Sequence, residues 1–294
     1  MITPTPPFPY FGGKYPISST IWRYFGDVSH YIEPFAGSLG VLLGRPHSHS
    51  QIIETVNDKN CLIANFWRAL QSDCDGVAQW ANSPINEADL LARHGWIASQ
   101  VEALRENIIS NPHYFDIKIA GWWVWGQALW LGDGWCSAKI SKRQMPSIST
   151  NKGIFKNESS RDIVDYLNRL SNRIKKVRVC CGDWQRVLSP AVIGTSKDIG
   201  IFLDPPYKGT EKVYGEVSVG VSQEVFEWAI ERSSFPNLKI AVCGLNGDYD
   251  FPKDWIEIPW KSSGGFRSSN NLSRLKERIW FSPNCGDIQL SLFA

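Results

Sequence analysis

The sequence predicts an α/β fold with a mostly parallel β-sheet, and two observations carry that prediction. Short apolar runs rich in β-branched residues recur along the chain, and segments with helical spacing, such as 223–231, separate several of them. Strands that alternate with helices favour parallel pairing, because a parallel neighbour needs a crossover connection. The expected strands are residues 31–32, 52–56, 177–180, 199–203 and 240–243.

Two more strands are expected late in the sequence, at residues 255–260 and 278–281. The segment between them contains Gly264 and Gly265. Adjacent glycines allow the tight backbone that an antiparallel hairpin-like connection needs.

The stretch 66–172 differs from its surroundings. It has helical patterning and few strand signals, and its segment GWWVWGQALWLGDGWC holds five of the 14 tryptophans. We expect a tryptophan-rich core of a small helical domain here. The alternative is that one or two of these rings face nucleic-acid bases. The predicted domains are therefore a discontinuous sheet domain (1–65 and 173–285), a helical insertion (66–172) and a short tail (286–294).

Positive charge is concentrated in parts of the chain although the net charge is only +2. Residues 139–178 hold eleven Lys and Arg against three Asp and Glu, and residues 261–278 form a second basic stretch. Such concentration favours a polyanionic partner, the alternative being a solvated charged face.

Several classes of protein are disfavoured by the sequence. No apolar run approaches the length of a membrane span, and the first residues lack a signal-peptide pattern, so we expect a cytoplasmic protein with no membrane partner. The seven cysteines include no CxxC pair and are expected to be reduced thiols. His47 and His49 have no accompanying ligand pattern, so no metal site is expected.

A glycine turn follows the first strand. Glu33 and Pro34 end that strand, and Gly37 and Gly40 allow close approach of the backbone to a ligand. Asp58 follows the next strand, where an acid is well placed to bind ribose hydroxyls. The spacing matches neither the dinucleotide fingerprint nor the phosphate loop. The pattern therefore indicates a nucleoside cofactor without phosphates, and S-adenosylmethionine is the obvious one.

The motif FLDPPY follows the strand at 199–203. Proline locks φ and keeps the preceding residue extended, so Asp204 and Pro205 are held beyond the strand end. Asp204 and the Pro205 carbonyl supply two hydrogen-bond acceptors, and Pro206 is followed by the stacking ring of Tyr207. Two acceptors beside an aromatic face suit an exocyclic amino group on a planar base. The simpler interpretation is a strand end followed by a turn.

These motifs, as a set, resemble the Dam-like DNA adenine N6-methyltransferases. The matching stretches are YFGGKYP, YIEPFAGSLGVLL, ETVND, CGDW and FLDPPY, in this order. GWWVWGQALWLGDGWC and RIWFSP are similar to segments of phage and prophage members. The resemblance implies a Rossmann-like sheet of an S-adenosylmethionine-dependent methyltransferase with an inserted helical DNA-recognition domain.

The resemblance also implies site residues. It places in the cofactor site Tyr10, Gly13, Lys14, Glu33, Pro34, Phe35, Gly37, Asp58, Asp183 and Asp204. Lys14 would neutralise the methionine carboxylate, Asp58 would hold the ribose, and Asp183 would meet the cofactor's adenine. The catalytic residues that would hold the flipped adenine are Asp204, Pro205, Pro206 and Tyr207. Many relatives have a glycine where this chain has Leu39, and Gly40 is expected to restore the turn.

Contacts to duplex DNA are expected from the basic stretches. The candidates are Lys139, Lys142, Arg143, Lys152, Lys156, Arg267 and Arg274. The tail contains QLSLF, which resembles the pentapeptide that docks bacterial polymerases and repair proteins on the β sliding clamp. Its docking residues would be Gln289, Leu290, Leu292 and Phe293. The alternative is an apolar tail packed on its own domain.

The expected function is thus site-specific methylation of adenine N6 in duplex DNA. Hydrogen bonds from the amine to Asp204 and the Pro205 carbonyl would draw its nitrogen toward sp³ geometry for in-line attack on the methyl group. Cytosine N4 or RNA adenine are alternative substrates, since both present an exocyclic amine. An inactive regulator that binds cofactor and DNA is the alternative outside catalysis.

Overall fold

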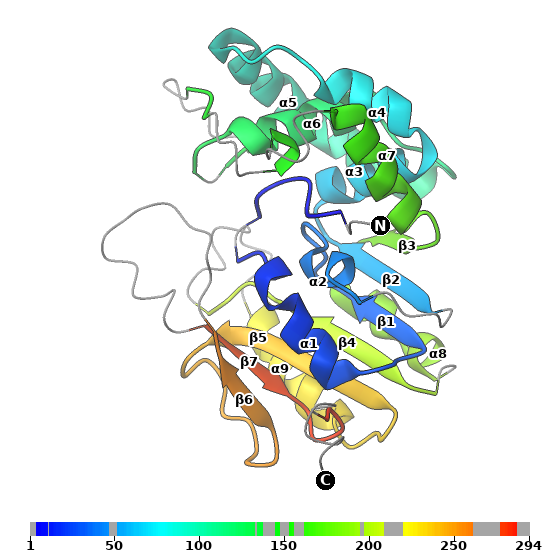
Figure 1. Ribbon diagram of the computed structural model, residues 1–294, viewed down its shortest axis with the longest axis vertical. Coiled ribbons are helices and arrows are strands. Elements are labelled where there is room, and N and C mark those ends of the chain that lie inside the picture. The colour runs from blue at the N-terminus through cyan, green and yellow to red at the C-terminus, as the bar shows by residue number, and fades with distance from the viewer. Residues whose placement is uncertain are drawn as a thin grey trace. The chain divides into compact units, whose positions relative to one another are not determined.

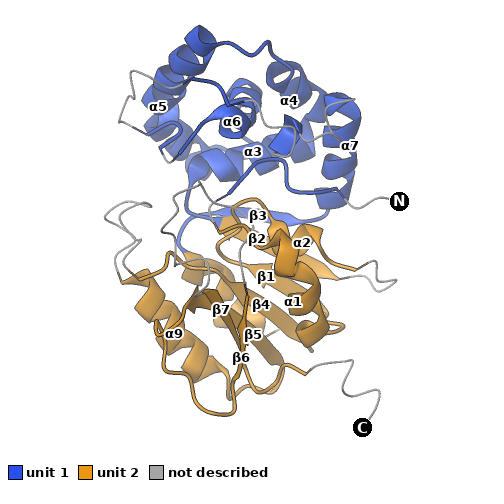
Figure 2. Ribbon diagram, turned by 60° about the vertical axis from the view of Figure 1, so that its left-hand side comes forward, with its two compact units in different colours: residues 1–10, 58–183 blue, residues 11–57, 184–294 orange. Residues whose placement is uncertain are grey.

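A computed structural model describes the residues 4–10, 12–46, 52–132, 134–137, 145–147, 153–155, 162–194, 197–208, 220–260 and 277–286. The chain divides into two compact units (Figure 2). Unit 1 consists of Met1–Tyr10 and Asp58–Asp183, and unit 2 consists of Phe11–Asn57 and Trp184–Ala294.

The sheet is mixed and has seven strands in the order β3-β2-β1-β4-β5-β7-β6 (Figure 1). Strand β1 pairs in parallel with β2 and β4, and β4 pairs in parallel with β5. Strand β7 runs antiparallel to both β5 and β6. The predicted α/β class and the late antiparallel pair are confirmed. The strands are β1 (His30–Glu33), β2 (Ile53–Asp58), β3 (Arg178–Cys181), β4 (Ile199–Leu203), β5 (Leu238–Leu245), β6 (Ile256–Pro259) and β7 (Glu277–Phe281).

Strand β4 occupies the middle of the sheet. All five of its residues are buried, as expected for a parallel strand with both faces covered. Its register pairs Ile201 with Ile32 of β1 on one side and with Ile240 of β5 on the other. The strand order reverses between β1 and β4, because β2 lies on the far side of β1. In open α/β sheets the crevice at such a reversal is where ligands bind.

Short helices accompany the sheet in unit 2. In α1, Ile21, Trp22 and Phe25 are buried, and the helix ends at Gly26, whose positive φ of 62° suits a glycine. The indole of Trp22 donates to the Val41 carbonyl at 2.8 Å, which joins α1 to α2. The helices of unit 2 are η1 (Tyr15–Ile17), α1 (Ser18–Phe25), α2 (Gly40–Leu43), η3 (Trp184–Leu188), α8 (Pro190–Ile193) and α9 (Val221–Arg232).

Unit 1 is mainly helical. An Asn or Asp side chain accepts a backbone N–H at the start of each of its α-helices, which is the expected helix N-cap. The predicted helical stretch 66–172 falls within this unit, which also takes in Met1–Tyr10 and β3. The helices are α3 (Cys61–Ser72), α4 (Cys74–Ala81), α5 (Glu87–Ser110), α6 (Ile117–Leu129), η2 (Gly153–Phe155) and α7 (Ile163–Ile174).

Tryptophans form much of the core of unit 1, as the core interpretation predicts. Trp123, Trp125 and Trp130 are buried, whereas Trp122 and Trp135 are half-buried. Phe8 adds an edge-on ring contact to Trp123 at 4.8 Å. None of the helices in the described ranges combines the length and the apolarity that a membrane span requires. None of the seven cysteines forms a disulfide.

Candidate functional site

The candidate site of unit 2 lies at the carboxyl ends of its central parallel strands. Glu33 is the last residue of β1, and Asp204 directly follows β4. The pairing of Leu203 with Val242 brings Asp204 next to Cys243 on β5. The carboxyl ends of parallel strands meet at one edge of a sheet, so these three side chains gather at the reversal of strand order.

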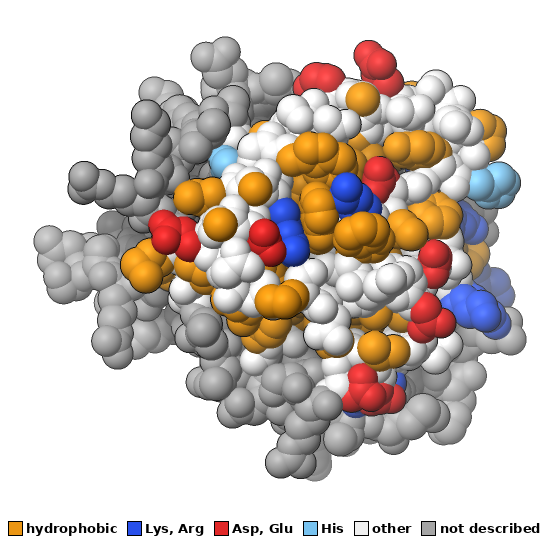
Figure 3. Space-filling view, turned by 90° about the horizontal axis from the view of Figure 1, so that it is seen from above, with side chains coloured by type: hydrophobic (Ala, Val, Ile, Leu, Met, Phe, Trp, Pro, Cys, Tyr) orange, Lys and Arg blue, Asp and Glu red, His pale blue; other side chains and the backbone are white. Residues whose placement is uncertain are grey.

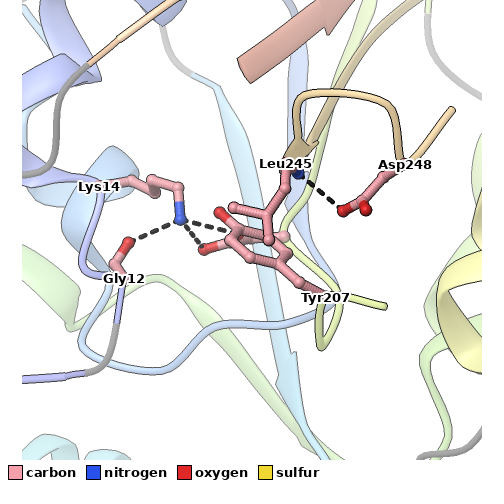
Figure 4. A network of polar contacts seen from close by, with 6 residues as sticks. Gly12, Lys14, Tyr207, Leu245 and Asp248 are labelled. Carbon is pink, nitrogen blue, oxygen red and sulfur yellow. Dashed lines mark hydrogen bonds and ion pairs between the residues drawn. The ribbon is translucent and has the colours of Figure 1, made fainter. Parts of the chain in front are cut away.

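The centre of the site is an ion pair between Lys14 and Asp204. Figure 4 shows Lys14 with Gly12 and Tyr207 nearby. Lys14 Nζ lies 2.8 Å from both carboxylate oxygens of Asp204 and donates a third hydrogen bond to the Gly12 carbonyl at 2.6 Å. The Lys14 side chain is 3% exposed and that of Asp204 is 19% exposed. An ammonium group has three N–H donors, so all of them are used in this arrangement.

Close backbone packing places Lys14 in this position. Gly12 has a positive φ of 69°, which lets the chain turn back toward Lys14. Gly40, at the start of α2, packs against the same segment. A Cβ atom on Gly40 would lie 2.7 Å from the backbone nitrogen of Tyr15 and 3.3 Å from that of Lys14. Only a residue without a Cβ allows α2 to begin this close to the lysine.

The surroundings of Lys14 keep its ammonium charged. Burial by itself lowers the pKa of a lysine, but the carboxylate of Asp204 and the nearby charge of Glu277 outweigh it, and the pKa of Lys14 is raised. The pKa of the Cys243 thiol is also raised, because it is buried, lies beside Asp204 and hydrogen-bonds it. Cys243 is therefore a neutral donor to the carboxylate rather than a nucleophile.

Two aromatic rings border the ion pair. Lys14 Nζ lies 5.3 Å from the centre of the Tyr207 ring and 5.5 Å from that of the Trp260 ring. The Tyr207 hydroxyl donates to Asp204 Oδ1 at 3.3 Å. Tyr207 was predicted from the FLDPPY motif, but Trp260 was not. Its only signal in the sequence is its place at the end of a strand-like run, which does not distinguish it from a core residue.

The predicted residue Glu33 lies at the same edge and is 2% exposed. The Tyr31 hydroxyl donates to its Oε2 at 3.0 Å. The pKa of Glu33 is raised to about 8, chiefly by burial and also by the charge of Asp204, although the bond from Tyr31 opposes this rise. Glu33 thus binds a proton far more readily than an exposed glutamate does.

The turn after β1 is anchored to β2. The Pro34 carbonyl accepts the Asn57 side-chain amide at 3.0 Å, and the Ala36 N–H donates to the Asn57 carbonyl at 2.9 Å. Gly37 has a positive φ of 46°. The Phe35 ring stacks on Trp184 with centres 6.0 Å apart. This turn therefore has a defined shape, with glycine at a position that glycine favours.

The turn before α2 contains a left-handed residue. Leu39, not Gly40, takes the left-handed conformation, with φ 58° and ψ 34°. This is the position where many of the resembling proteins have glycine, which would adopt it without strain. Leu39 is fully buried, so packing of its side chain offsets the backbone cost. Gly40 serves instead as the contact point for the Lys14 segment.

The other predicted site residues of unit 2 lie near the same motifs. Pro205 is buried and Pro206 is half-buried between Asp204 and Tyr207, and Gly13 is half-buried beside Lys14. Tyr10, Asp58 and Asp183 belong to unit 1. There, Asp58 accepts the Asn60 N–H at 2.8 Å, and its carbonyl accepts the Gly182 N–H at 3.2 Å. Their contribution to a cofactor site stays a prediction.

The predicted contacts to DNA and to the sliding clamp fall outside the described residues. These are Lys139, Lys142, Arg143, Lys152, Lys156, Arg267 and Arg274 for DNA, and Gln289, Leu290, Leu292 and Phe293 for the clamp. In the ranges that the structure describes, no group of three or more His, Cys, Asp or Glu side chains is arranged to hold a metal ion.

The chain matches no known protein-family model, and none of the curated protein sequences matches it. The chemistry of the site therefore has to be judged from its own geometry. It presents a carboxylate that is accessible to a ligand, is held by a buried cation, and lies beside two aromatic rings at the strand reversal. Such a group can accept hydrogen bonds from an amine on a planar ring.

Proposed function

We propose that this protein transfers a methyl group from S-adenosylmethionine to the exocyclic N6 amine of a flipped adenine in duplex DNA. The observation that carries the proposal is the Lys14–Asp204 ion pair at the carboxyl end of β4, with Tyr207 beside it. It brings together residues from YFGGKYP and FLDPPY, two motifs of the resemblance that are far apart in the sequence.

The glycine turn after β1 supports the proposal of such a cofactor. It lies at the strand reversal, and Gly37 takes the positive φ that a close backbone approach favours. S-adenosylmethionine, when bound, supplies an electrophilic methyl group on a sulfonium. Lys14 was expected to neutralise the cofactor's carboxylate, but all three of its donors already have acceptors. That role requires the exchange of one of these bonds.

Asp204 is the residue to which we assign orientation of the amine. Its carboxylate accepts one N6–H, the Pro205 carbonyl accepts the other, and the nitrogen lone pair is thereby directed at the methyl carbon. The transfer would return the electron pair of the methyl–sulfur bond to sulfur, and the methylated amine would release its extra proton to water. The hydrogen bonds from Lys14 hold the Asp204 carboxylate in position to act as an acceptor.

The helical unit is proposed to take part in DNA recognition, together with the basic stretches of the chain. The excess of Lys and Arg in residues 139–178 supports phosphate contacts, since phosphates dominate the affinity of proteins for DNA. Base flipping costs a few kcal/mol, and stacking on Tyr207 offsets part of this cost.

The proposal is tested by nucleoside mass spectrometry of DNA from a methylation-deficient host that expresses the protein. We expect N6-methyladenine with the unchanged protein and none with Asp204→Ala. Asp198→Ala is the matched control, because Asp198 is exposed and lies just before β4, at the opposite end of the same strand. It should leave the level of N6-methyladenine unchanged.

Other outcomes of this measurement are equally informative. N4-methylcytosine in place of N6-methyladenine would keep the mechanism and replace the substrate. Unmodified DNA from a folded protein that binds S-adenosylmethionine would contradict the proposal and favour RNA as substrate, or an inactive regulator. Sequencing of the modified DNA would then give the recognition site.

A further inference from the structure

Trp260 borders the candidate site, and the proposed mechanism gives it no role. It directly follows β6, and its backbone N–H donates to the carbonyl of Glu277 at 3.1 Å, at the start of β7. This bond extends the antiparallel pairing of Pro259 with Arg278 by one residue. The sheet itself therefore holds the backbone of Trp260 in place.

The Trp260 ring borders the same ammonium group as Tyr207. Lys14 Nζ lies 5.5 Å from the Trp260 ring centre and 5.3 Å from the Tyr207 ring centre, and it is bonded to both oxygens of Asp204. Lys14 Nζ thus lies among Trp260, Tyr207 and Asp204. Trp260 therefore belongs to the same cluster of side chains around Lys14 as the carboxylate.

The indole N–H of Trp260 has no hydrogen-bond partner among the described residues. The side chain is 9% exposed, and Nε1 is buried. An indole nitrogen is a donor only, and a buried donor without an acceptor is unfavourable. Buried polar groups are nearly always paired, so an unpaired one beside a candidate site points to an acceptor on the ligand.

The structures of the nucleobases indicate which ligand atom could be the acceptor for Trp260. In adenine the amino group at C6 is next to N1, a ring nitrogen that accepts a hydrogen bond. Cytosine has the same arrangement, with N3 beside its amine, whereas the corresponding ring nitrogens of guanine and thymine carry hydrogen. An acceptor and a donor side by side in the protein therefore complement the Watson–Crick edge of an amino-bearing base.

We propose that Trp260 Nε1 donates a hydrogen bond to the ring nitrogen next to the reacting amine, N1 in adenine. This inference rests on the proposed function and names a specificity residue for it. Asp204 accepts a hydrogen bond from the amine, and Trp260 donates one to the ring nitrogen beside that amine. Together the two residues reject guanine and thymine, in which the corresponding ring nitrogen carries a hydrogen. If the Trp260 ring only shielded Lys14 from water, a ring without an N–H group would pack there equally well.

The test compares target duplexes that carry adenine or 1-deazaadenine at the methylated position, in which N1 is replaced by C–H. Methylation rates under single-turnover conditions are measured for the unchanged protein, Trp260→Phe and Trp255→Phe. Trp255 is the matched control, because it is 7% exposed, lies just before β6 and stacks on Phe251 at 4.2 Å.

The unchanged protein and Trp255→Phe should lose about tenfold in rate on 1-deazaadenine, the order expected for one unmade buried hydrogen bond. Trp260→Phe should be about tenfold slower on adenine and show little further loss on 1-deazaadenine. The ratio between the two substrates is taken within each variant. It therefore does not depend on how much protein has folded, and the altered reactivity of the deaza base cancels when the ratios of two variants are compared.

Equal ratios in Trp260→Phe and in the unchanged protein would overturn the inference and leave Trp260 as a packing residue. Failure of the unchanged protein to methylate the adenine duplex at all would instead contradict the proposed function. The two failures are therefore distinguishable.

Discussion

Lys118 in unit 1 and Lys14 in unit 2 both lie over aromatic rings, and the comparison between them shows what distinguishes the candidate site. In unit 1, Lys118 Nζ lies 4.4 Å from the Trp122 ring, 4.6 Å from Trp96 and 5.5 Å from Trp80. In unit 2, Lys14 also contacts two rings but is bonded to a carboxylate as well.

The difference between these lysines lies in their access to water. Lys118 is half-buried and Trp96 is 36% exposed, so the ammonium keeps part of its hydration and the rings suffice as neighbours. Figure 3 shows a surface on which hydrophobic side chains lie beside Lys and Arg side chains in this manner. Lys14 is 3% exposed and therefore needs an opposite charge. Lys118, near the surface, lies over aromatic rings. Lys14 is buried and paired with a carboxylate, and this distinguishes the candidate functional site.

The largest expected effect comes from removing each lysine in turn. Lys14→Met leaves Asp204 without its cation and should lower the free energy of unfolding by about 3–5 kcal/mol. Lys118→Met should lower it by about 0.5–1 kcal/mol, because only cation–π contacts are lost. Urea unfolding followed by circular dichroism measures both. Similar losses in the two variants would mean that the ion pair has no special importance for stability.

A smaller effect is expected from adding one methyl group at a glycine of each unit. Gly40→Ala places a Cβ against the backbone of Tyr15 and should destabilise the protein by about 1–3 kcal/mol. Gly95, inside α5, has open space where a Cβ would be added. Gly95→Ala should therefore stabilise the helix by about 0.5–1 kcal/mol. Thermal unfolding midpoints should move in opposite directions, and a shared direction would contradict the packing described at Lys14.

The smallest effect concerns pH. The pKa of Glu33 is raised to about 8 from an ordinary 4.5. Between these two pH values the folded state keeps a proton on Glu33, whereas the unfolded state has released it. Stability from this group is present below pH 4.5 and is lost as the pH rises toward 8. The unchanged protein should therefore be less stable at about pH 8 than at about pH 6, on the order of 1–2 kcal/mol.

Glu33→Gln should remove this dependence on pH. Glu102→Gln in unit 1 should keep it, because the Glu102 side chain is 78% exposed and makes only a surface ion pair with Arg105. Urea midpoints at the two pH values decide between these expectations. A flat profile for the unchanged protein would mean that Glu33 stays ionised in the folded state.

Much of the fold followed from local patterns in the sequence. The apolar runs predicted each strand to within a few residues. In β4 and β5 the reason is burial on both faces, which leaves continuous apolar stretches. Helical spacing similarly predicted the character of unit 1. The conformation of Leu39 was not predictable, because it depends on how α2 packs against Tyr15 rather than on the residue itself.

The candidate site was predictable only in pieces. Lys14 and Asp204 were each singled out from a motif, but nothing local indicates that two residues 190 positions apart form an ion pair. Trp260 has no distinguishing pattern at all, since its importance comes from the hydrogen bond to Glu277 and from its distance to Lys14. Such contacts are properties of the tertiary structure.

The separation of Lys14 from Asp204 has a consequence for how the chain folds on the ribosome. The lysine emerges 190 residues before its carboxylate. At ordinary rates of translation this interval lasts about 10–40 s. During that time the helices of unit 1 are synthesised in one uninterrupted run, while β1 lacks its central neighbour β4. Lys14 cannot be buried without cost until Asp204 arrives, so completion of the site coincides with closure of the sheet.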